Sequence, residues 1–557
     1  MKSTMASMIP EERRLAIRQS GFWPDRLITD YLDRNIRESP ERIAIVEENS
    51  MTGETNALSY AELGRRVDRL AASLAALGIG AGDVVSYQLP NWWQFTALHL
   101  AAMRLGAVTN PLMPIFRERE LTFMLSLTQS KVFVVPRNFR GFDYRAMARS
   151  LQPRLPALKR LFVIGGEGEE AFERLLEAPS IAKGAALSLS KGAALSLSKG
   201  PPPSADDVIQ ILFTSGTTGE PKGVMHTSNT LISALTPYAE RLHLGASDVV
   251  LMASPMAHQT GFMYGLMMPI VLGAKAVLQD QWNPERAADL IAGENVSFTM
   301  AATPFLSDLA DAAERRPDQF ASLRIFLSAG APIPRVLVRR AAENMGAAII
   351  SAWGMTENGA VTTTRPEDPR EKVFETDGCA LPGMEIRVVD ENRKVQPPGV
   401  EGRLEVKTCS NFAGYFKRPE WYTIDAQGWF DSGDLARMDE EGYVRLTGRA
   451  KDIIIRGGEN IPVVEVEGLI YQHPAVVEAA IVAMPDSRLG ERACAFVVTR
   501  EGRRLTLAEL TEFLLAQKIA KPYLPERLEI VSSLPKTPSG KIQKFRLREI
   551  AKEFAAS

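Results

Sequence analysis

The feature that most constrains the fold of this chain is the alternation of short β-branched runs with helical patterns. Apolar runs occupy 131–136, 161–166 and 208–216, and an amphipathic helical pattern begins at Ala61. Parallel strands need long crossover connections, and these usually contain a helix. The alternation therefore predicts an α/β fold with parallel sheets covered by helices.

The later part of the chain follows a different pattern. Segments 401–408 and 441–449 alternate apolar and polar residues, which is typical of half-buried antiparallel strands. After Gly448 the pattern restarts as a shorter mixed unit that ends near Leu547. We therefore expect a domain boundary near Lys451 and a small C-terminal domain beyond it.

Composition excludes several classes of protein. The chain has 557 residues, 45% of them hydrophobic, which is more than one core can hold. Lysine plus arginine (65) nearly balance aspartate plus glutamate (67), so no net field attracts nucleic acid. The three cysteines, Cys379, Cys409 and Cys494, are far apart and fit neither a disulfide framework nor a metal site. These properties predict a cytoplasmic protein that acts on small molecules.

Two segments bear on membranes and export. The N-terminal residues carry charges where a secretory signal needs an apolar core. The long uncharged stretch 249–274 is interrupted by Pro255, His258 and Pro269, among others, whereas a spanning helix needs about 20 mainly apolar residues. We expect no transmembrane segment, and we expect 249–274 to form a buried helix and a pocket loop.

An octapeptide repeat stands apart from this organisation. The unit "KGAALSLS" occurs twice from Lys183, a third copy begins, and three prolines follow. Two copies of eight residues cannot form a solenoid. We interpret 183–203 as a flexible insertion, and the sequence assigns it no role.

The stretch "LFTSGTTGEPKGVMHTS", 212–228, places glycines, hydroxyl side chains and Lys222 directly after an apolar run. Glycines let the backbone approach phosphate oxygens, amides and hydroxyls donate hydrogen bonds, and lysine supplies positive charge. The stretch therefore predicts a polyphosphate site. It matches neither the common nucleotide loop G-x-x-x-x-G-K-[ST] nor the dinucleotide pattern G-x-G-x-x-G. Standard kinases and dehydrogenases are thus disfavoured.

With five further motifs, this loop resembles the signature set of the adenylate-forming enzymes, specifically the acyl-CoA synthetase branch. The motifs occur in the family's order: "TSGTTGEPKG" at Thr214, "SAGAP" at Ser328, "WGMTE" at Trp353, "GWFDSGDLA" at Gly428, "GRAKDIIIRGGENI" at Gly448 and "LPKTPSGKIQK" at Leu534. The resemblance implies a large N-terminal domain of several subdomains, 1–450, with parallel and mixed sheets and a β-barrel-like part. It also implies a small mobile α+β C-terminal domain, 451–557.

The resemblance implies an ATP site on matching residues. The loop residues would hold the β- and γ-phosphates: Thr214, Ser215, Gly216, Thr217, Thr218, Gly219 and Lys222. The other implied contacts are with adenine (Gly330, Ala331 and Trp353), with phosphate (Thr356), with Mg²⁺ (Glu357) and with ribose (Asp434 and Arg449). Without these motifs, an isolated carboxylate would more often be a solvated charge, and a single Trp353 would more often be core packing.

The C-terminal motifs imply a two-step reaction. Lys541 matches the family's catalytic lysine, which neutralises charge at the α-phosphate and carboxylate while an acyl-adenylate and pyrophosphate form. A thiol, in this branch coenzyme A, then releases AMP. Lys451 matches the hinge about which the small domain rotates between the steps, and Gly457 and Gly458 would let pantetheine pass close to the backbone.

The acid substrate is the least constrained part of the prediction. His258 occupies the family's gate position at the acyl pocket, although a histidine among methionines is otherwise usually a core residue. The absence of carboxylates between Leu251 and Leu278 disfavours a cationic acid. N-terminal segments resemble ligases of medium-chain and alicyclic acids, such as cyclohexanecarboxylate, and these acids are the expected substrates. The sequence gives no chain length, pathway or oligomeric state, so a homo-oligomer is left open.

Two other functions stay open at this stage. One is an adenylating enzyme that loads the phosphopantetheine of a carrier protein, although no carrier domain is recognised in the sequence. The other is a nucleotide-binding relative without catalysis, which the presence of Lys222, Glu357 and Lys541 disfavours.

Overall fold

The computed structural model describes residues 5–177, 202–214, 221–330, 333–450, 452–456, 459–486, 488–537 and 540–555. Two compact units divide the chain. The first unit comprises Met1–Met300, Gly354–Ala360 and Thr408–Thr423; the second comprises Ala301–Trp353, Val361–Lys407 and Ile424–Ser557. The octapeptide insertion lies outside the described residues, and so does Lys451. The predicted boundary between 450 and 451 therefore stays a prediction.

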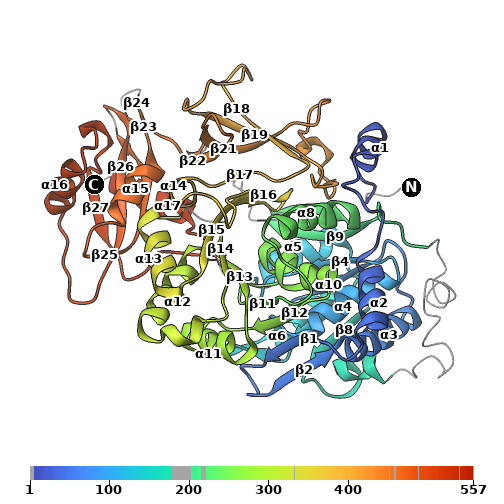
Figure 1. Cartoon of the computed structure of the whole chain (residues 1–557). Coiled ribbons are helices and arrows are strands. Elements are labelled where there is room, and N and C mark those ends of the chain that lie inside the picture. Colours follow the sequence, from blue (N-terminus) through green and yellow to red (C-terminus); the bar gives the residue numbers. More distant parts are fainter. Residues whose placement is uncertain are drawn as a thin grey trace. The chain divides into compact units, whose positions relative to one another are not determined.

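The first unit contains a seven-stranded sheet in the order β20-β10-β9-β4-β3-β5-β8, of which β9, β4 and β8 are labelled in Figure 1. Its strands are β3 (Val84–Tyr87), β4 (Val108–Pro111), β5 (Val132–Pro136), β8 (Arg160–Ile164), β9 (Val208–Thr214), β10 (Lys222–Thr227) and β20 (Gly414–Tyr415). Strands β9, β4, β3, β5 and β8 pair in parallel, whereas β10 is antiparallel to both neighbours. All three apolar runs predicted as strands are confirmed. Each is almost continuously apolar because both faces of a parallel sheet are covered.

A second group of strands in the first unit has the order β13-β11-β12-β1-β2. These are β1 (Ile43–Glu48), β2 (Thr55–Ser59), β11 (Val249–Met252), β12 (Lys275–Gln279) and β13 (Phe298–Ala301). The helices of this unit include α1 (Glu11–Gln19), α2 (Ile28–Glu38), α3 (Tyr60–Ala76), α4 (Trp93–Arg104), α5 (Glu118–Thr128), α6 (Tyr144–Leu151), α8 (Ser228–Arg241) and α11 (Pro284–Glu294).

Helix α3 shows why the sequence pattern predicted a helix here. The Ser59 side chain caps it by accepting a hydrogen bond from the Glu62 amide. Its buried positions recur at intervals of three and four residues, which places them on one face. They are Tyr60, Leu63, Gly64, Val67, Leu70, Ala71 and Leu74. This face packs against α2 and α4.

The uncharged stretch 249–274 departs from the prediction. It begins with strand β11 and ends with α10 (Met268–Leu272), so it is more than a helix and a loop. Between them, Phe262–Met267 forms a π-helix, and all six of its residues are buried. Such segments are rare and occur often at functional sites. Among the described helices, none is long and apolar enough to cross a membrane.

The second unit begins with mixed sheet and helix. Its first elements are α12 (Thr303–Arg315), β14 (Ile325–Ser328), α13 (Arg335–Met345), β15 (Ala348–Met355), β16 (Gly359–Thr363), α14 (Arg370–Glu375) and β17 (Cys379–Ala380). A four-stranded sheet follows in the order β18 (Met384–Val389), β19 (Gly402–Thr408), β21 (Phe430–Met438) and β22 (Val444–Arg449). Strands β19 and β22 were predicted from their alternating residues, and both pair antiparallel with β21, which was not predicted.

The C-terminal part of the second unit is a compact α+β arrangement, drawn in orange to red in Figure 1. Its strands are β23 (Ile454–Arg456), β24 (Glu459–Ile461), β25 (Val476–Asp486), β26 (Gly490–Thr499) and β27 (Arg527–Ile530). The helices α15 (Val463–Ile470), α16 (Leu507–Ala516) and α17 (Lys544–Ala555) accompany them. Two apolar clusters form its core. The predicted fold class, mixed sheets followed by a smaller α+β part, is confirmed.

Candidate active site

The predicted phosphate loop connects two paired strands. Strand β9 ends at Thr214, β10 begins at Lys222, and these two residues lie opposite each other in the register. Antiparallel pairing therefore fixes both ends of the loop. The five loop residues between them in the prediction, Ser215, Gly216, Thr217, Thr218 and Gly219, lie outside the described residues.

The Lys222 ammonium lies over two aromatic rings. It is 5.0 Å from the ring centroid of Tyr415 and 5.2 Å from that of Trp421. An ammonium is attracted to the negative face of such rings within about 6 Å. Strand β20 brings Tyr415 there, because it pairs with β10 and places Tyr415 opposite Val224. The two neutral rings thus hold the lysine side chain in place.

The Glu357 side chain is buried, with 7% of its surface exposed. Its Oε1 accepts a hydrogen bond of 2.8 Å from the Tyr415 hydroxyl. Burial, together with the neighbouring Glu357 carboxylate, raises the pKa of Tyr415 far above its usual value. The phenol therefore stays protonated and donates. The backbone is tied as well, since the Glu357 carbonyl accepts from the Phe412 amide at 2.7 Å.

His226 holds the backbone at Thr356. Its Nε2 lies 2.7 Å from the Thr356 carbonyl oxygen, which can only accept, so Nε2 carries the proton. Its Nδ1 lies 3.0 Å from the Thr230 hydroxyl. Burial lowers the pKa of His226 to about 4, so the ring is neutral near pH 7. Thr356 is thereby positioned through its main chain, and its predicted contact with phosphate stays a prediction.

Sequence reasoning assigned no role to His226 or Tyr415. His226 lies within the quoted loop stretch, and a histidine inside the apolar strand "KGVMHT" was a usable signal. Tyr415 follows Gly414 in "AGYF" and carried no comparable signal. Its contact with Glu357 joins positions 58 residues apart.

The second unit assembles three of the predicted nucleotide residues. One Asp434 oxygen accepts from the Trp353 indole nitrogen at 2.8 Å, and the other pairs with Arg449 Nε at 2.7 Å. Asp434 is 4% exposed, and it lies opposite Arg449 in the β21–β22 register. Each carboxylate oxygen can accept a further bond, so the group is oriented and still able to accept ribose hydroxyls. Trp353 therefore has an observed role beside its predicted one at adenine.

Gly330 follows β14 on an exposed bend with φ of +84°, a conformation that side chains rarely adopt. An added Cβ would meet no described atom within 4 Å, so the backbone there is open to a flat ligand. Ala331, its predicted partner against adenine, lies outside the described residues.

Lys541 is exposed on a tight turn. Its amide donates to the Thr537 hydroxyl at 3.0 Å, and its carbonyl accepts from the Thr537 amide at 2.7 Å. Gly540 before it has φ of +83°, and an added Cβ would lie 3.2 Å from Cγ of Pro304. The turn thus fixes the backbone and leaves a long side chain at the surface. Lys451, Gly457 and Gly458 lie outside the described residues, so their predicted roles stay predictions.

His258 begins the short helical turn before the π-helix. Its Nδ1 accepts from the Thr260 amide at 3.3 Å. Gly261 follows at a close approach, because an added Cβ would lie 2.2 Å from the Pro255 carbonyl oxygen. Beyond it, the rings of Tyr238 and Tyr264 lie 4.7 Å apart. The predicted gate residue therefore leads into a tightly packed, largely apolar segment.

The carboxylates bear on whether a metal can bind. No group of three or more His, Cys, Asp or Glu side chains that could hold a metal occurs among the residues described. Mg²⁺ in nucleotide sites usually takes one or two carboxylates and completes its shell with phosphates and water. A single oriented carboxylate, Glu357, fits this donor set once a triphosphate is bound.

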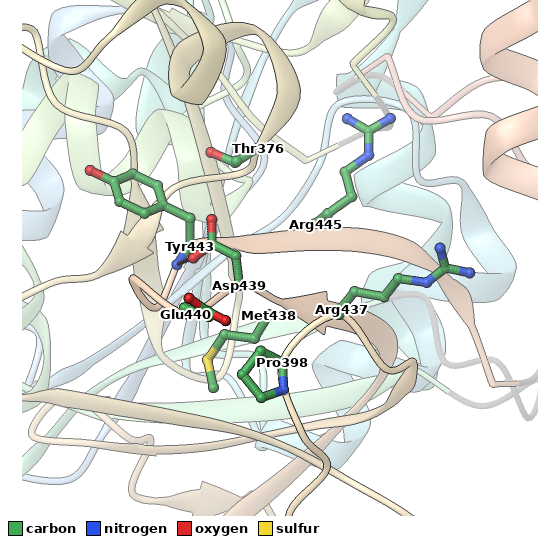
Figure 2. Close-up of a pocket in the computed structure, with 9 residues that line it drawn as sticks. Thr376, Pro398, Arg437, Met438, Asp439, Glu440, Tyr443 and Arg445 are labelled. Atoms are coloured by element: carbon green, nitrogen blue, oxygen red, sulfur yellow. Dashed lines mark hydrogen bonds between the residues drawn. The ribbon is translucent and has the colours of Figure 1, made fainter.

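A shallow pocket of about 350 Å³ opens in the second unit (Figure 2). The β21–β22 hairpin supplies most of its wall, and Arg437 and Arg445, which lie opposite each other in the register, extend side by side in Figure 2. Its described lining is Thr376, Pro398, Gly399, Arg437, Met438, Asp439, Glu440, Tyr443 and Arg445. This lining includes none of the residues predicted for the active site.

Two family models match this chain. Residues 32–416 match the family described as AMP-binding enzyme, and residues 465–541 match the AMP-binding enzyme C-terminal domain. The match confirms the resemblance drawn from the six motifs.

The similar proteins cover nearly the whole chain. A medium-chain fatty-acid–CoA ligase of Escherichia coli (strain K12) is 39% identical over 97% of this chain and 93% of its own length. A 2,3-dihydroxybenzoate-AMP ligase of Bacillus subtilis (strain 168) is 35% identical over 98% of this chain and 97% of its own length. The crystal structure of ATP-bound MatB from Rhodopseudomonas palustris has a TM-score of 0.81, is 28% identical, and covers 94% of this chain and 99% of that one.

Proposed function

Because this chain belongs to the AMP-binding enzyme family, an AMP-forming acid ligase class, we propose that it joins a medium-chain or alicyclic carboxylic acid to coenzyme A. In the first step a carboxylate oxygen bonds to the α-phosphorus of ATP, and the bond to pyrophosphate breaks. In the second step the thiol sulfur of CoA bonds to the acyl carbon, and the bond to AMP breaks. The observation that carries this proposal is the pairing of Glu357 and Lys222 through Tyr415.

In this proposal each predicted nucleotide residue keeps the role that its motif implies. Thr214, Lys222 and the loop between them hold the β- and γ-phosphates, and Thr356 bonds a phosphate oxygen. Glu357 holds Mg²⁺, which when bound neutralises phosphate charge. Asp434 accepts the ribose hydroxyls because Arg449 and Trp353 already orient its two oxygens. Gly330 and Ala331 lie against adenine beside Trp353.

Lys541 supplies the mobile charge of the first step. Its ammonium stabilises the negative charge that builds on the carboxylate and α-phosphate, an effect of positioning and electrostatics. An exposed side chain on a turn with a fixed backbone suits this role, because it can enter and leave a site without unfolding anything.

Rotation of the C-terminal domain about Lys451 separates the two steps in this proposal, and Gly457 and Gly458 then admit pantetheine. Proline at the hinge restricts the backbone dihedral that must change. We expect Lys451→Pro to retain pyrophosphate exchange and to lose thioester formation. Separate assays of the two half-reactions test this, and equal loss of both would contradict the hinge.

The acid class rests on two supports. The wall after His258 is apolar and carries no carboxylate between Leu251 and Leu278, which disfavours cationic acids. The Escherichia coli relative is a ligase of medium-chain fatty acids. The deciding experiment is a panel of linear, cyclic and aromatic acids from about four to twelve carbons, read by AMP release with CoA present. Highest kcat/KM with an aromatic acid would reject this class.

A second function is favoured by a specific observation. A relative from Mycobacterium tuberculosis (strain ATCC 25618 / H37Rv), 34% identical over 96% of this chain, is named as a salicyl-AMP ligase and salicyl-S-ArCP synthetase. This chain would then transfer the acyl group of its adenylate to the thiol of a carrier-protein phosphopantetheine, and AMP would leave. Presenting the adenylate with free CoA and, separately, with a carrier protein distinguishes the acceptors. Absence of pyrophosphate exchange with every acid would indicate a non-catalytic relative.

A further inference from the structure

Tyr415 contacts two charged groups of opposite sign through two different parts of its side chain. Its hydroxyl donates to Oε1 of Glu357 at 2.8 Å. The face of its ring meets the Lys222 ammonium, 5.0 Å from the centroid. The tyrosine is 3% exposed, so both contacts form away from bulk water, where electrostatic interactions are stronger.

The backbone holds Tyr415 between these groups. Strand β20 pairs with β10, so Tyr415 lies opposite Val224, two positions from Lys222. On either side of Tyr415, main-chain amides donate to β10. The Phe416 amide donates to the Gly223 carbonyl at 2.8 Å, and the Ala413 amide donates to the Met225 carbonyl at 2.8 Å. The ring is therefore fixed relative to the lysine strand by the sheet itself.

The same loop holds the Glu357 segment. The Phe412 amide donates to the Glu357 carbonyl at 2.7 Å, and the Ser410 hydroxyl donates to the Asn358 carbonyl at 2.7 Å. Residues 410–416 thus join the lysine strand to the glutamate turn by three main-chain hydrogen bonds and one from the Ser410 hydroxyl. Tyr415 is the side chain of this loop that reaches both charges.

A direct ion pair would use each of these charges to neutralise the other. A phenol instead contacts a cation with its ring and an anion with its hydroxyl, and it adds no charge of its own. Both groups then remain able to act on a third one. A polyphosphate with a bound divalent cation presents a partner for each: anionic oxygens for Lys222 and the cation for Glu357.

We propose that Tyr415 is a positioning residue that sets the Glu357 carboxylate for Mg²⁺ and the Lys222 ammonium for phosphate in the same bound nucleotide. The proposal rests on the proposed function, since it assumes that Mg·ATP binds at these residues. It predicts that the two contacts can be separated: the hydroxyl governs the metal requirement, and the ring governs binding of phosphate without metal.

The test measures ATP binding by isothermal titration calorimetry over a range of Mg²⁺ concentrations and again in EDTA. Tyr415→Phe removes only the hydroxyl. Because a hydrogen bond to a charged group is lost, we expect the Mg²⁺ concentration for half-maximal ATP binding to rise roughly tenfold, with metal-free ATP binding unchanged. Tyr415→Leu removes the ring as well, and we expect metal-free ATP binding to weaken by roughly threefold to tenfold in addition.

Tyr422→Phe is the matched control. Tyr422 lies on the same segment with its ring 5.3 Å from that of Phe412, and its buried hydroxyl has no hydrogen-bond partner within the described part of the chain. We expect this variant to bind Mg·ATP as the wild type does. An equal effect of both phenylalanine variants would overturn the proposal, because it would show a general packing effect.

A double-mutant cycle with Glu357→Gln keeps the test decisive if Tyr415→Leu does not fold. Glutamine still accepts from Tyr415 but attracts metal less. If Tyr415 acts through Glu357, Tyr415→Phe adds no further change in the Mg²⁺ requirement of that variant. Additive effects, or an unchanged Mg²⁺ requirement in Tyr415→Phe alone, would overturn the proposal while the function stands. Failure of the wild type to bind Mg·ATP would overturn both.

Discussion

Glu357, the proposed ligand of Mg²⁺, and Lys541, the proposed lysine at the α-phosphate, are held by the fold in contrasting ways. Glu357 is 7% exposed, its carboxylate is held by Tyr415, and its main chain is held by Phe412. Lys541 is exposed on a turn, and its main-chain amide and carbonyl both bond to Thr537. One group is buried and oriented, and the other is exposed at the surface.

This contrast matches the expected demands on each group. A metal ligand gains affinity from preorganisation, since ordering it on binding would cost free energy. A group needed in one step and absent from the next must move at low cost. We therefore expect substitutions in the two places to separate into effects on catalysis, on binding and on stability.

The largest expected effect is at the exposed lysine. Lys541→Ala should lower pyrophosphate exchange roughly 100-fold or more, by analogy with loss of one preorganised donor at a transition state. The melting temperature and the Kd for Mg·ATP should change little, because the side chain is exposed in the folded protein. Exchange assays, thermal melts and calorimetry measure the three quantities.

The control for this change is Lys521→Ala, at another exposed lysine of the second unit. It should keep wild-type exchange. A large loss of ATP affinity in Lys541→Ala would contradict the contrast, because it would make the lysine part of the preformed binding site.

The buried carboxylate of the second unit should affect binding next most strongly. Asp434→Asn keeps the shape and one acceptor oxygen for the Trp353 indole, but it removes the charge that pairs with Arg449. We expect roughly tenfold to hundredfold weaker ATP binding, as for loss of hydrogen bonds to a charged group. Calorimetry with ATP and with pyrophosphate distinguishes a ribose contact from a phosphate contact. Because pyrophosphate has no ribose, its binding should be nearly unchanged in this variant.

His226 should affect stability in acid. Burial lowers its pKa to about 4 in the folded chain, below about 6.5 in the unfolded chain. The unfolded chain then binds more protons between these pH values, so this contribution is complete above about pH 6.5 and is lost as pH falls toward about 4. At pH 5 the loss is about 2 kcal/mol.

His226→Gln removes this titration while its amide can still donate to the Thr356 carbonyl. We expect its melting temperature to fall less between pH 7 and pH 5 than that of the wild type. His243→Asn, at an exposed position with φ of +51°, is the control and should melt as the wild type does at both values. Parallel curves for His226→Gln and the wild type would contradict the assignment.

The smallest effect is expected where the N-terminal segment meets the Tyr415 loop. The Trp23 indole donates to the Cys409 carbonyl at 2.7 Å, and that carbonyl also accepts from the Ser233 hydroxyl at 3.2 Å. Trp23→Phe therefore leaves the carbonyl with a partner, and we expect a loss of about 1 kcal/mol in stability. Thermal melts measure it, and ATP affinity should stay within about twofold. A larger loss of affinity would show that this segment also orients the site.

Local patterns predicted much of the fold. The strands at 132–136, 160–164 and 208–214 and the helix from Tyr60 are all present. Each is set by nearby residues through periodicity and caps, which a single sequence displays. The stretch 249–274 was predicted less well, because a short apolar strand and a buried helix look alike without alternation.

The sequence predicted several residues of the candidate site but not the hydrogen bonds that join them. Lys222, Glu357 and Asp434 were named from motifs, whereas Tyr415 and His226 were not. The bonds that join them span 58 residues for Tyr415 to Glu357 and 130 for His226 to Thr356. Such contacts depend on strand pairing across the fold, and spacing along one sequence carries no information about it.

The chain is anchored on both sides of the octapeptide repeats. Before them, Leu175 is 3% exposed and its carbonyl accepts from the Ser73 hydroxyl at 2.8 Å. After them, the Asp206 carboxylate accepts from Arg18 and Asn229. Closing a chain between fixed ends costs only about 0.6 kcal/mol more for each doubling of its length. Gain or loss of one octapeptide copy in the gene would therefore keep the reading frame of the residues that follow, β9 included. The change in folding free energy would be small, so selection for a folded protein would act on it only weakly.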